Sequence, residues 1–223
     1  MARPYFRQVP NFDYVSRIND SKQISNYVQV KNLFRRVKLR PDIYQNTGYF
    51  EQYIIKGDER PDSVAYRLYS DPTLDWVVLL SNNILNIQTE WPMKQGDFDS
   101  YLLEKYGSYE NLYAVHHYET TEIVNSEGTV IVPEGLIVDE NFSVSYFNYF
   151  TESQEIASNF VNEITNYDYE SKIQDNKRKI YVLKADYLRI VFDDIDKLMP
   201  YKKGSSQYVT ETLKRGDNIR LYE

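Results

Sequence analysis

Residues 53–84 read YIIKGDERPDSVAYRLYSDPTLDWVVLLSNNI, and the fold prediction starts from this stretch. Its first residues continue an alternation of apolar and polar side chains from FEQ, which is typical of a β-strand. Gly57-Asp58 is a turn signal that ends the strand. Pro61 suits the first position of a helix, where its missing N–H costs nothing. The apolar stripe that follows consists of Val64, Ala65, Leu68 and Tyr69, and its spacing predicts a helix.

A second helix is expected after a short break. Asp71 precedes Pro72, so it stops the first helix and is well placed to cap the second. Leu74 and the residues from Trp76 to Leu80 cover more than one helical face, which indicates that this helix is enclosed on several sides. Asn82-Asn83 predicts a left-handed stop.

This order of strand, Gly-Asp turn, two helices and Asn-Ile resembles the LysM module, a small βααβ unit best known for binding peptidoglycan or chitin. About 40 residues carry the resemblance. The chain departs from the module in having Glu59-Arg60-Pro61 where a Thr-Leu pair is usual, and a weak second strand after Asn83. The resemblance implies a groove between Gly57-Asp58 and Asn82-Asn83 that takes an N-acetyl sugar.

The wider sequence resembles the baseplate wedge protein of contractile-tailed bacteriophages, whose LysM-like domain clamps adjacent wedges together. The matching segments are NLFRR, the quoted stretch, TEWPMKQGDFDSYLLEKYGS and ITNYDYESKIQDNKRKIYVLKADYLRIVFDDIDKLM, from about Asn32 to Met199. The resemblance implies a non-enzymatic virion component, assembled in the host cytoplasm and built in symmetric copies into a six-fold ring around the tail tube. It also implies that the partners are other baseplate wedge proteins and sheath-initiator-like subunits.

The composition of the 223 residues excludes several function classes. There are no cysteines, which removes disulfides, thiolate catalysis and Cys-based metal sites. The two histidines, His116 and His117, are adjacent in a strand-like sequence. We therefore expect their side chains on opposite faces of a sheet, where they cannot bind the same metal ion. A net charge of −7 disfavours nucleic acid, and no apolar run approaches the ~20 residues that span a bilayer. We expect no catalytic, cofactor or metal site.

The aromatic and basic residues of the N-terminal half suggest contacts with other chains. The chain has 22 tyrosines, which favour surfaces that another chain covers as well as half-buried strand positions. The first 30 residues read as an extended arm, and the basic segment VQVKNLFRRVKL reads as a strand or edge segment that either is solvated or docks an acidic surface. The predicted partner interface consists of Tyr5, Phe6, Phe12, Tyr14, Leu33, Phe34, Arg35, Arg36, Tyr53, Trp76 and Trp91.

The remainder of the chain predicts both helices and strands. KQGDFDSYLLEKYGS reads as a helix stopped by Gly107, and residues 113–150 read as a three-stranded meander with a hairpin turn at Ser126-Glu127-Gly128. Ile156, Phe160, Ile164 and Tyr167 suggest an amphipathic helix from Ser153. RKIYVLKADY reads as a strand, YLRIVFDDIDKLM as a helix, and the terminal NIRLYE as a strand that pairs with a neighbour or stays mobile.

The predicted fold is therefore α+β: a small βααβ LysM-like domain with an extended N-terminal arm, and a C-terminal antiparallel β-rich part with two or three helices. The predicted boundaries are 1–48 for the arm and edge strand, 49–92 for the LysM-like domain, 93–107 for a connecting helix, 108–200 for the meander and helices, and 201–223 for the tail.

Three functions follow from these observations. A structural wedge component that joins neighbouring wedge subunits by protein contacts is preferred. A LysM-type glycan-binding protein and a cell-wall hydrolase are the alternatives. The carboxylates that could suggest a hydrolase, Asp186, Asp193, Asp194 and Asp196, spread around the polar face of a helix and read as a solvated surface.

Overall fold

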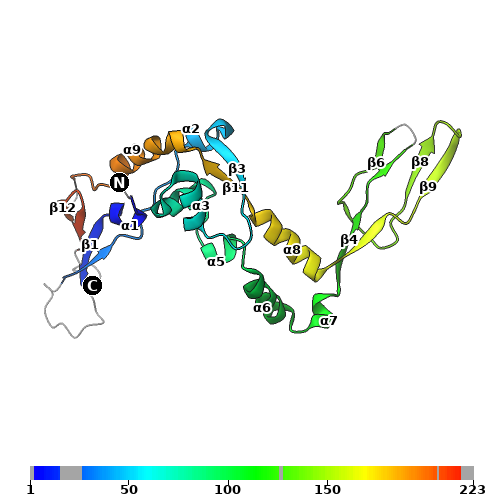
Figure 1. Ribbon diagram of the computed structural model, residues 1–223, viewed down its shortest axis with the longest axis horizontal. Coiled ribbons are helices and arrows are strands. Elements are labelled where there is room, and N and C mark those ends of the chain that lie inside the picture. The colour runs from blue at the N-terminus through cyan, green and yellow to red at the C-terminus, as the bar shows by residue number, and fades with distance from the viewer. Residues whose placement is uncertain (1–2, 16–26, 126–127, 205, 217–223) are drawn as a thin grey trace. The chain divides into compact units, whose positions relative to one another are not determined.

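The computed structural model describes residues 3–15, 27–125, 128–204 and 206–216. The chain forms two compact units: unit 1 comprises residues 1–91 and 179–223, and unit 2 comprises residues 92–178. Helices and small, largely antiparallel sheets occur in both units (Figure 1), which confirms the α+β class.

Unit 1 is built around residues 53–84. Strand β3 (Phe50–Ile54) leads to helices α3 (Pro61–Tyr69) and α4 (Asp75–Ser81), as predicted. The side chains of Val64, Val77 and Val78 are fully buried. They pack with Val191 and Ile195 of α9 (Leu188–Leu198), another helix that the sequence predicted.

The turn signals of this stretch act as expected, with one refinement. The Asp71 carboxylate accepts a hydrogen bond of 2.9 Å from the Thr73 N–H and so caps a 3-10 turn, η2 (Pro72–Leu74), after which α4 begins. Asn83 has a positive φ of 54° and follows the end of α4, which confirms the left-handed stop.

The second strand predicted directly after Asn83 is wrong. Residues 84–86 form a loop that leads into the short helix α5 (Ile87–Glu90). The antiparallel partner of β3 is β11 (Lys179–Leu183), which lies far away in the sequence. The Asn82 side chain ties the end of α4 to this strand, because it accepts a hydrogen bond of 2.8 Å from the Tyr181 N–H and donates one of 2.8 Å to the Tyr181 carbonyl.

The chain ends of unit 1 form a second sheet, with the strand order β12 (Tyr208–Thr210), β13 (Leu213–Arg215), β1 (Asn11–Val15) and β2 (Tyr27–Lys31). Strand β1 is parallel to β13 and antiparallel to β2. Much of the segment expected as an extended arm is therefore packed, in helix α1 (Tyr5–Gln8) and in β1. The predicted terminal strand NIRLYE lies outside the described residues.

Between β2 and β3 the chain forms a loop, helix α2 (Pro41–Tyr44) and a 3-10 turn, η1 (Thr47–Tyr49). The strand expected over VQVKNLFRRVKL therefore ends at Lys31. A further 3-10 turn, η3 (Ala185–Tyr187), connects β11 to α9.

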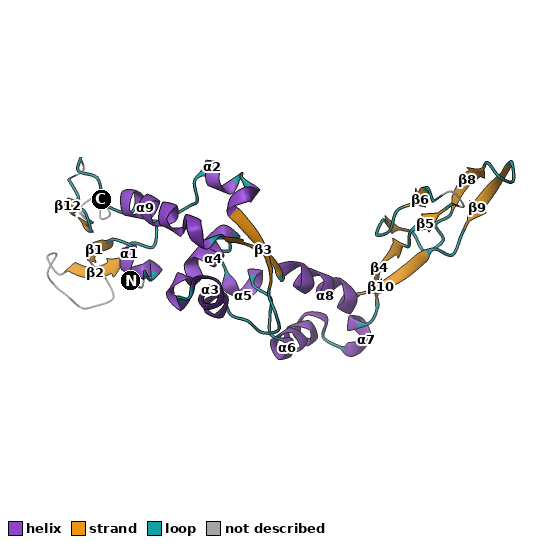
Figure 2. Ribbon diagram, turned by 45° about the horizontal axis from the view of Figure 1, so that its top comes forward, coloured by secondary structure: helices purple, strands orange, loops and turns teal. Residues whose placement is uncertain are grey.

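The described residues of unit 2 form three helices: α6 (Gln95–Tyr106), α7 (Tyr109–Leu112) and α8 (Asn166–Lys177). Phe98, Leu102 and Leu112 form their small core. Gly107 has a φ of 77° at the end of α6, which confirms the predicted helix stop. Figure 2 shows α6 and α7 beside α8, and α8 contacts both β4 and β10.

The strands in the described part of unit 2 form three small sheets. β10 (Val161–Thr165), β4 (Val115–Thr120) and β7 (Ile137–Val138) make one sheet in that order. β5 (Ile123–Val124) pairs with β6 (Val130–Val132), and β8 (Val144–Asn148) pairs with β9 (Ser153–Ala157). The β-rich character is as predicted, but the single three-stranded meander is wrong, because its strands are divided between these sheets. Residues 126–127 of the predicted hairpin turn are outside the described residues.

The helix predicted from Ser153 is also wrong, because this stretch forms β9 and β10. Ile156, Phe160 and Ile164 recur every four residues, and four is a multiple of the strand period as well as close to the helical one. The helix begins only at Asn166. There Thr165 and Asp168 form a capping box, in which each side chain accepts a hydrogen bond from the other residue's N–H.

Candidate interaction surfaces

The predicted interface residues all belong to unit 1 and fall into three groups by exposure. Trp76 and Trp91 are buried in its core, where their indole N–H groups donate hydrogen bonds of 3.0 Å to the Arg3 and Glu59 carbonyls. Tyr5, Phe12, Tyr14, Arg35 and Tyr53 are partly buried, while Phe6, Leu33, Phe34 and Arg36 are exposed. The structure therefore separates residues that hold unit 1 together from residues that remain uncovered.

The N-terminal aromatic residues lie over the tryptophan of α4. The Tyr5 ring centroid is 5.9 Å from that of Trp76 and 5.6 Å from that of Phe6. Arg3 lies 4.9 Å from the centroid of the Phe192 ring and forms a salt bridge of 3.1 Å with Asp196. These contacts anchor the first residues of the chain on unit 1, and Phe6 is left with 60% of its surface exposed.

Residues 32–35 form a tight turn after β2, which we call the apex turn. The Arg35 N–H donates a hydrogen bond of 3.1 Å to the Asn32 carbonyl across it. The Arg35 guanidinium donates to the carbonyls of Met199 and Pro200 at 2.8 and 3.1 Å, which fixes the turn to the end of α9. Between these anchors Leu33 is 71% exposed and Phe34 is fully exposed. An anchored turn thus presents two large apolar side chains to solvent.

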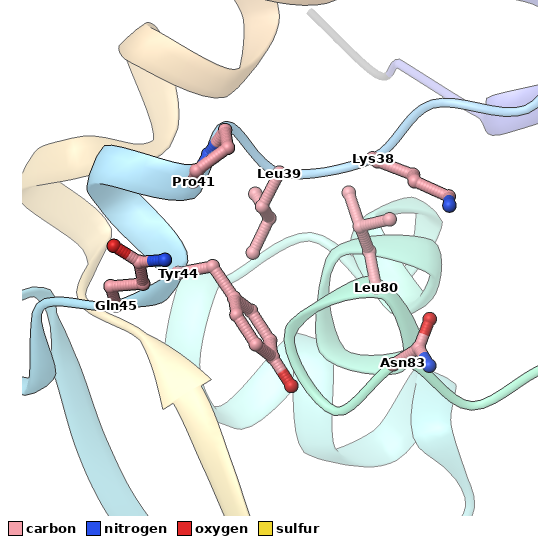
Figure 3. Close-up of a pocket in the computed structure, with 7 residues that line it drawn as sticks. All are labelled: Lys38, Leu39, Pro41, Tyr44, Gln45, Leu80 and Asn83. Atoms are coloured by element: carbon pink, nitrogen blue, oxygen red, sulfur yellow. The ribbon is translucent and has the colours of Figure 1, made fainter.

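A pocket of about 280 Å³ lies further along the same surface segment. Figure 3 shows Leu39 and Tyr44 pointing into the same space as Leu80 of α4. Lys38 and Asn83 stand at its rim, and the Asn83 side chain accepts a hydrogen bond of 3.2 Å from Arg36. The pocket is slightly smaller than the ~300–1,000 Å³ of small-molecule sites, so its size suits a single side chain.

Glu59, at one of the departures from the LysM pattern, is the centre of a polar network between β3 and α3. Its carboxylate accepts hydrogen bonds of 2.8 Å from the Tyr53 hydroxyl and 3.1 Å from the Lys56 N–H, and lies 2.5 Å from the Arg67 guanidinium. Burial alone raises the pKa of Glu59, but these hydrogen bonds and the Arg67 charge outweigh it and lower the pKa. This network joins secondary-structure elements within unit 1, and its contacts are structural.

The expectation that His116 and His117 point to opposite faces is wrong. Ile164 pairs with His117 and Thr165 with Val115, so His116 is the extra residue of a β-bulge. The bulge lets the two Nδ1 atoms approach to 2.7 Å, and His116 stacks on Tyr169. Over the ranges that the structure describes, no group of three His, Asp or Glu residues is arranged to hold a metal ion.

The β8–β9 hairpin carries an exposed apolar surface that is absent from the interface predicted from the sequence. We call residues 147–152 the hairpin tip. Phe147, Tyr149 and Phe150 are each more than half exposed, and Ile156 of β9 is exposed as well. The signal that could have found this region is charge, since residues 106–171 contain 12 Asp and Glu residues but no Lys or Arg.

The carboxylates of α9 either form salt bridges or face solvent. Asp194 lies 3.4 Å from the Arg40 guanidinium, Asp196 pairs with Arg3, and Asp193 is exposed. These are structural or solvated roles rather than a paired acid and base.

The sequence profile of the family described as base plate wedge protein 53 matches residues 6–198. The chain belongs to the phage base plate wedge protein family. This wedge protein is a structural component of the phage tail baseplate and is not an enzyme. It interacts with other baseplate components. A search of curated proteins finds no match. Among the described helices of the wedge protein, none is long and apolar enough to cross a membrane.

Proposed function

We propose that this wedge protein joins neighbouring wedge subunits into the six-fold baseplate ring, and that its exposed apolar surfaces are the contacts. The observation that carries the proposal is the apex turn. Phe34 is fully exposed although the turn around it is held by three hydrogen bonds to the Asn32, Met199 and Pro200 carbonyls. A rigid turn loses little conformational entropy when a partner covers it. The partners in this proposal are other wedge proteins and sheath-initiator-like subunits.

The test compares matched substitutions of exposed residues. We expect Leu33→Gln combined with Phe34→Gln to leave the fold of the protein intact and to reduce its incorporation into baseplates at least about tenfold, as for a hot spot at a protein interface. Tyr66→Gln, an exposed aromatic residue on α3, is the control and should assemble normally. Electron microscopy of tails and sedimentation of assembled baseplates measure incorporation. Normal assembly of the double variant would contradict this role of the apex turn.

The glycan-binding alternative has less support from the polar groups near its groove. The Asn82 side chain donates to the Val78 and Tyr181 carbonyls and accepts from the Tyr181 N–H, and the Asn83 side-chain oxygen accepts from Arg36. Binding an N-acetyl sugar there requires free donors and acceptors. A pull-down on purified peptidoglycan separates the two functions, and the structural proposal predicts no retention.

A further inference from the structure

The two units carry opposite net charges. Unit 2 has 16 Asp and Glu residues against 5 Lys and Arg, a formal charge of −11. Unit 1 has 17 acidic and 21 basic residues, a formal charge of +4. One copy of the chain therefore presents an acidic unit and a basic unit, and each is electrostatically complementary to the other unit of a second copy.

The hairpin tip is the apolar feature of the acidic unit. In β8 and β9, Phe147 and Ile156 lie on one face, because Phe147 is opposite Gln154 and Ser145 is opposite Ile156. Tyr149 packs edge-on against Phe147 with ring centroids 5.1 Å apart. Phe150 stands at the turn with 71% of its surface exposed, and Glu152 beside it is also exposed.

The hairpin tip is held in shape by hydrogen bonds. The Glu155 carboxylate accepts from the Tyr146 hydroxyl and the Asn148 amide, both at 2.9 Å, and from the Thr151 hydroxyl at 3.0 Å. The Asn148 side chain accepts in turn from the Phe150 N–H at 2.9 Å. The exposed phenylalanine is therefore positioned before any partner binds, which lowers the entropic cost of docking.

The pocket shown in Figure 3 is complementary to the hairpin tip in its apolar lining and in its charge. Its interior is apolar, with Leu39, Leu80 and the ring of Tyr44, and a lysine, Lys38, stands at the rim. It belongs to the basic unit and suits one aromatic side chain in size. The exposed Leu33 and Phe34 precede it by a few residues, so it continues the segment that the proposed function already uses.

We propose that the hairpin tip of one copy docks on unit 1 of a second copy, with Phe150 in the pocket and Glu152 beside Lys38. The inference rests on the proposed function and deepens it by naming one neighbour. The contact joins two different surfaces, so each copy offers one tip and one pocket. Such heterologous contacts build rings when the rotation between copies closes, and open chains when it does not.

The experiment uses the full chain and three variants that each add one glutamate at an exposed aromatic position. Phe150→Glu alters the tip, Tyr44→Glu alters the pocket, and Tyr109→Glu is the control outside both surfaces. Sedimentation velocity over a concentration series measures the mass, and circular dichroism verifies the fold of each variant. We expect the wild type and the control to associate with rising concentration, and the tip and pocket variants to associate at least about tenfold more weakly.

Mixing the tip variant with the pocket variant is the decisive measurement. The tip variant keeps a working pocket and the pocket variant keeps a working tip, so the mixture can form one heterologous contact. We expect dimers and nothing larger. Association of the wild type should also weaken as salt is raised, because the unit charges are then screened.

A wild type that stays monomeric at every concentration would overturn the inference, as would a tip variant that associates normally or a mixture that stays monomeric. If the wild type is monomeric but Phe150→Glu blocks incorporation into baseplates, the tip binds a different wedge protein. That outcome rejects the second copy as occupant and leaves the proposed function standing. Failure of the apex-turn variants to impair assembly contradicts the proposed function separately.

Discussion

At the scale of single residues, Glu59 shows how unit 1 uses a nearly buried charge. Its folded-state pKa is lowered below the ordinary value of 4.5, with burial opposed by the Lys56 N–H, the Tyr53 hydroxyl and the Arg67 charge. A carboxyl group with a lowered pKa stabilises the fold above its unfolded-state pKa, and this contribution is lost as the pH falls through the folded-state pKa. The stabilisation from Glu59 is therefore present at neutral pH and fades below about pH 4.5.

We predict that Glu59→Gln lowers the free energy of unfolding at pH 7 by about 1–3 kcal/mol, because it weakens hydrogen bonds to a charged, poorly exposed group. The loss should be smaller at pH 4, because protonation of Glu59 in the unfolded state below its ordinary pKa of 4.5 already removes part of the stabilisation. Urea denaturation at both pH values measures it. Glu51→Gln, which removes the same charge at an exposed position of β3, is the control and should change little. If Glu59→Gln and Glu51→Gln lower the free energy of unfolding equally, the hydrogen-bond network of Glu59 does not account for the loss of stability.

At the scale of elements, the β8–β9 hairpin carries a hydrogen-bond network centred on Glu155. A two-stranded hairpin is marginally stable by itself, so the side-chain network matters more here than in a larger sheet. The hydrogen bonds from Tyr146, Thr151 and Asn148 lower the pKa of Glu155. Their stabilising effect is thus retained above the ordinary pKa of 4.5 and is lost as the pH falls through the folded-state value.

We predict that Glu155→Ala speeds amide hydrogen exchange in residues 144–157 and leaves exchange in unit 1 unchanged. Lowering the pH below about 4.5 should loosen the same hairpin in the wild type more than in the variant, once exchange is corrected for its intrinsic pH dependence. Exchange followed by mass spectrometry measures both effects. The control is Glu122→Ala, an exposed carboxylate in the same unit. Unchanged protection in Glu155→Ala would mean that backbone pairing alone holds the hairpin.

At the scale of the whole molecule, the N-terminal segment is a structural part of unit 1. Strand β1 lies between β13 and β2, and the preceding Val9 is almost completely buried. Arg3 and Tyr5 also contact residues of α4 and α9.

We predict that removing residues 1–30 lowers the melting temperature of unit 1 and exposes the amides of β13 to exchange, because a strand with two partners is lost. Exchange in unit 2 should not change. If the amides of β13 remain protected from exchange without β1, the sheet does not depend on the N-terminal segment. The truncated protein can then be used to test whether this segment binds other baseplate proteins.

The sequence by itself determined the α+β class, the elements from Phe50 to Asn83, helices α6 and α9, and strand β11. These follow from apolar spacing and from caps such as Pro61, Asp71 and Gly107, which act within one or two helical turns. The sequence also indicated the family, because its motifs are contiguous. The absence of Lys and Arg from residues 106–171 is also visible in the sequence. Only the division of the chain into two units shows that one unit is acidic and the other basic.

Only the tertiary structure decided which strands pair, since β3 with β11 and β1 with β13 join residues far apart in the sequence. It decided that Ile156, Phe160 and Ile164 belong to strands and their connection, because a spacing of four suits both periods and long-range pairing selects one. It also decided which aromatic residues are core and which are surface. Trp76 and Phe34 have similar apolar character, and burial depends on neighbours that local sequence does not specify.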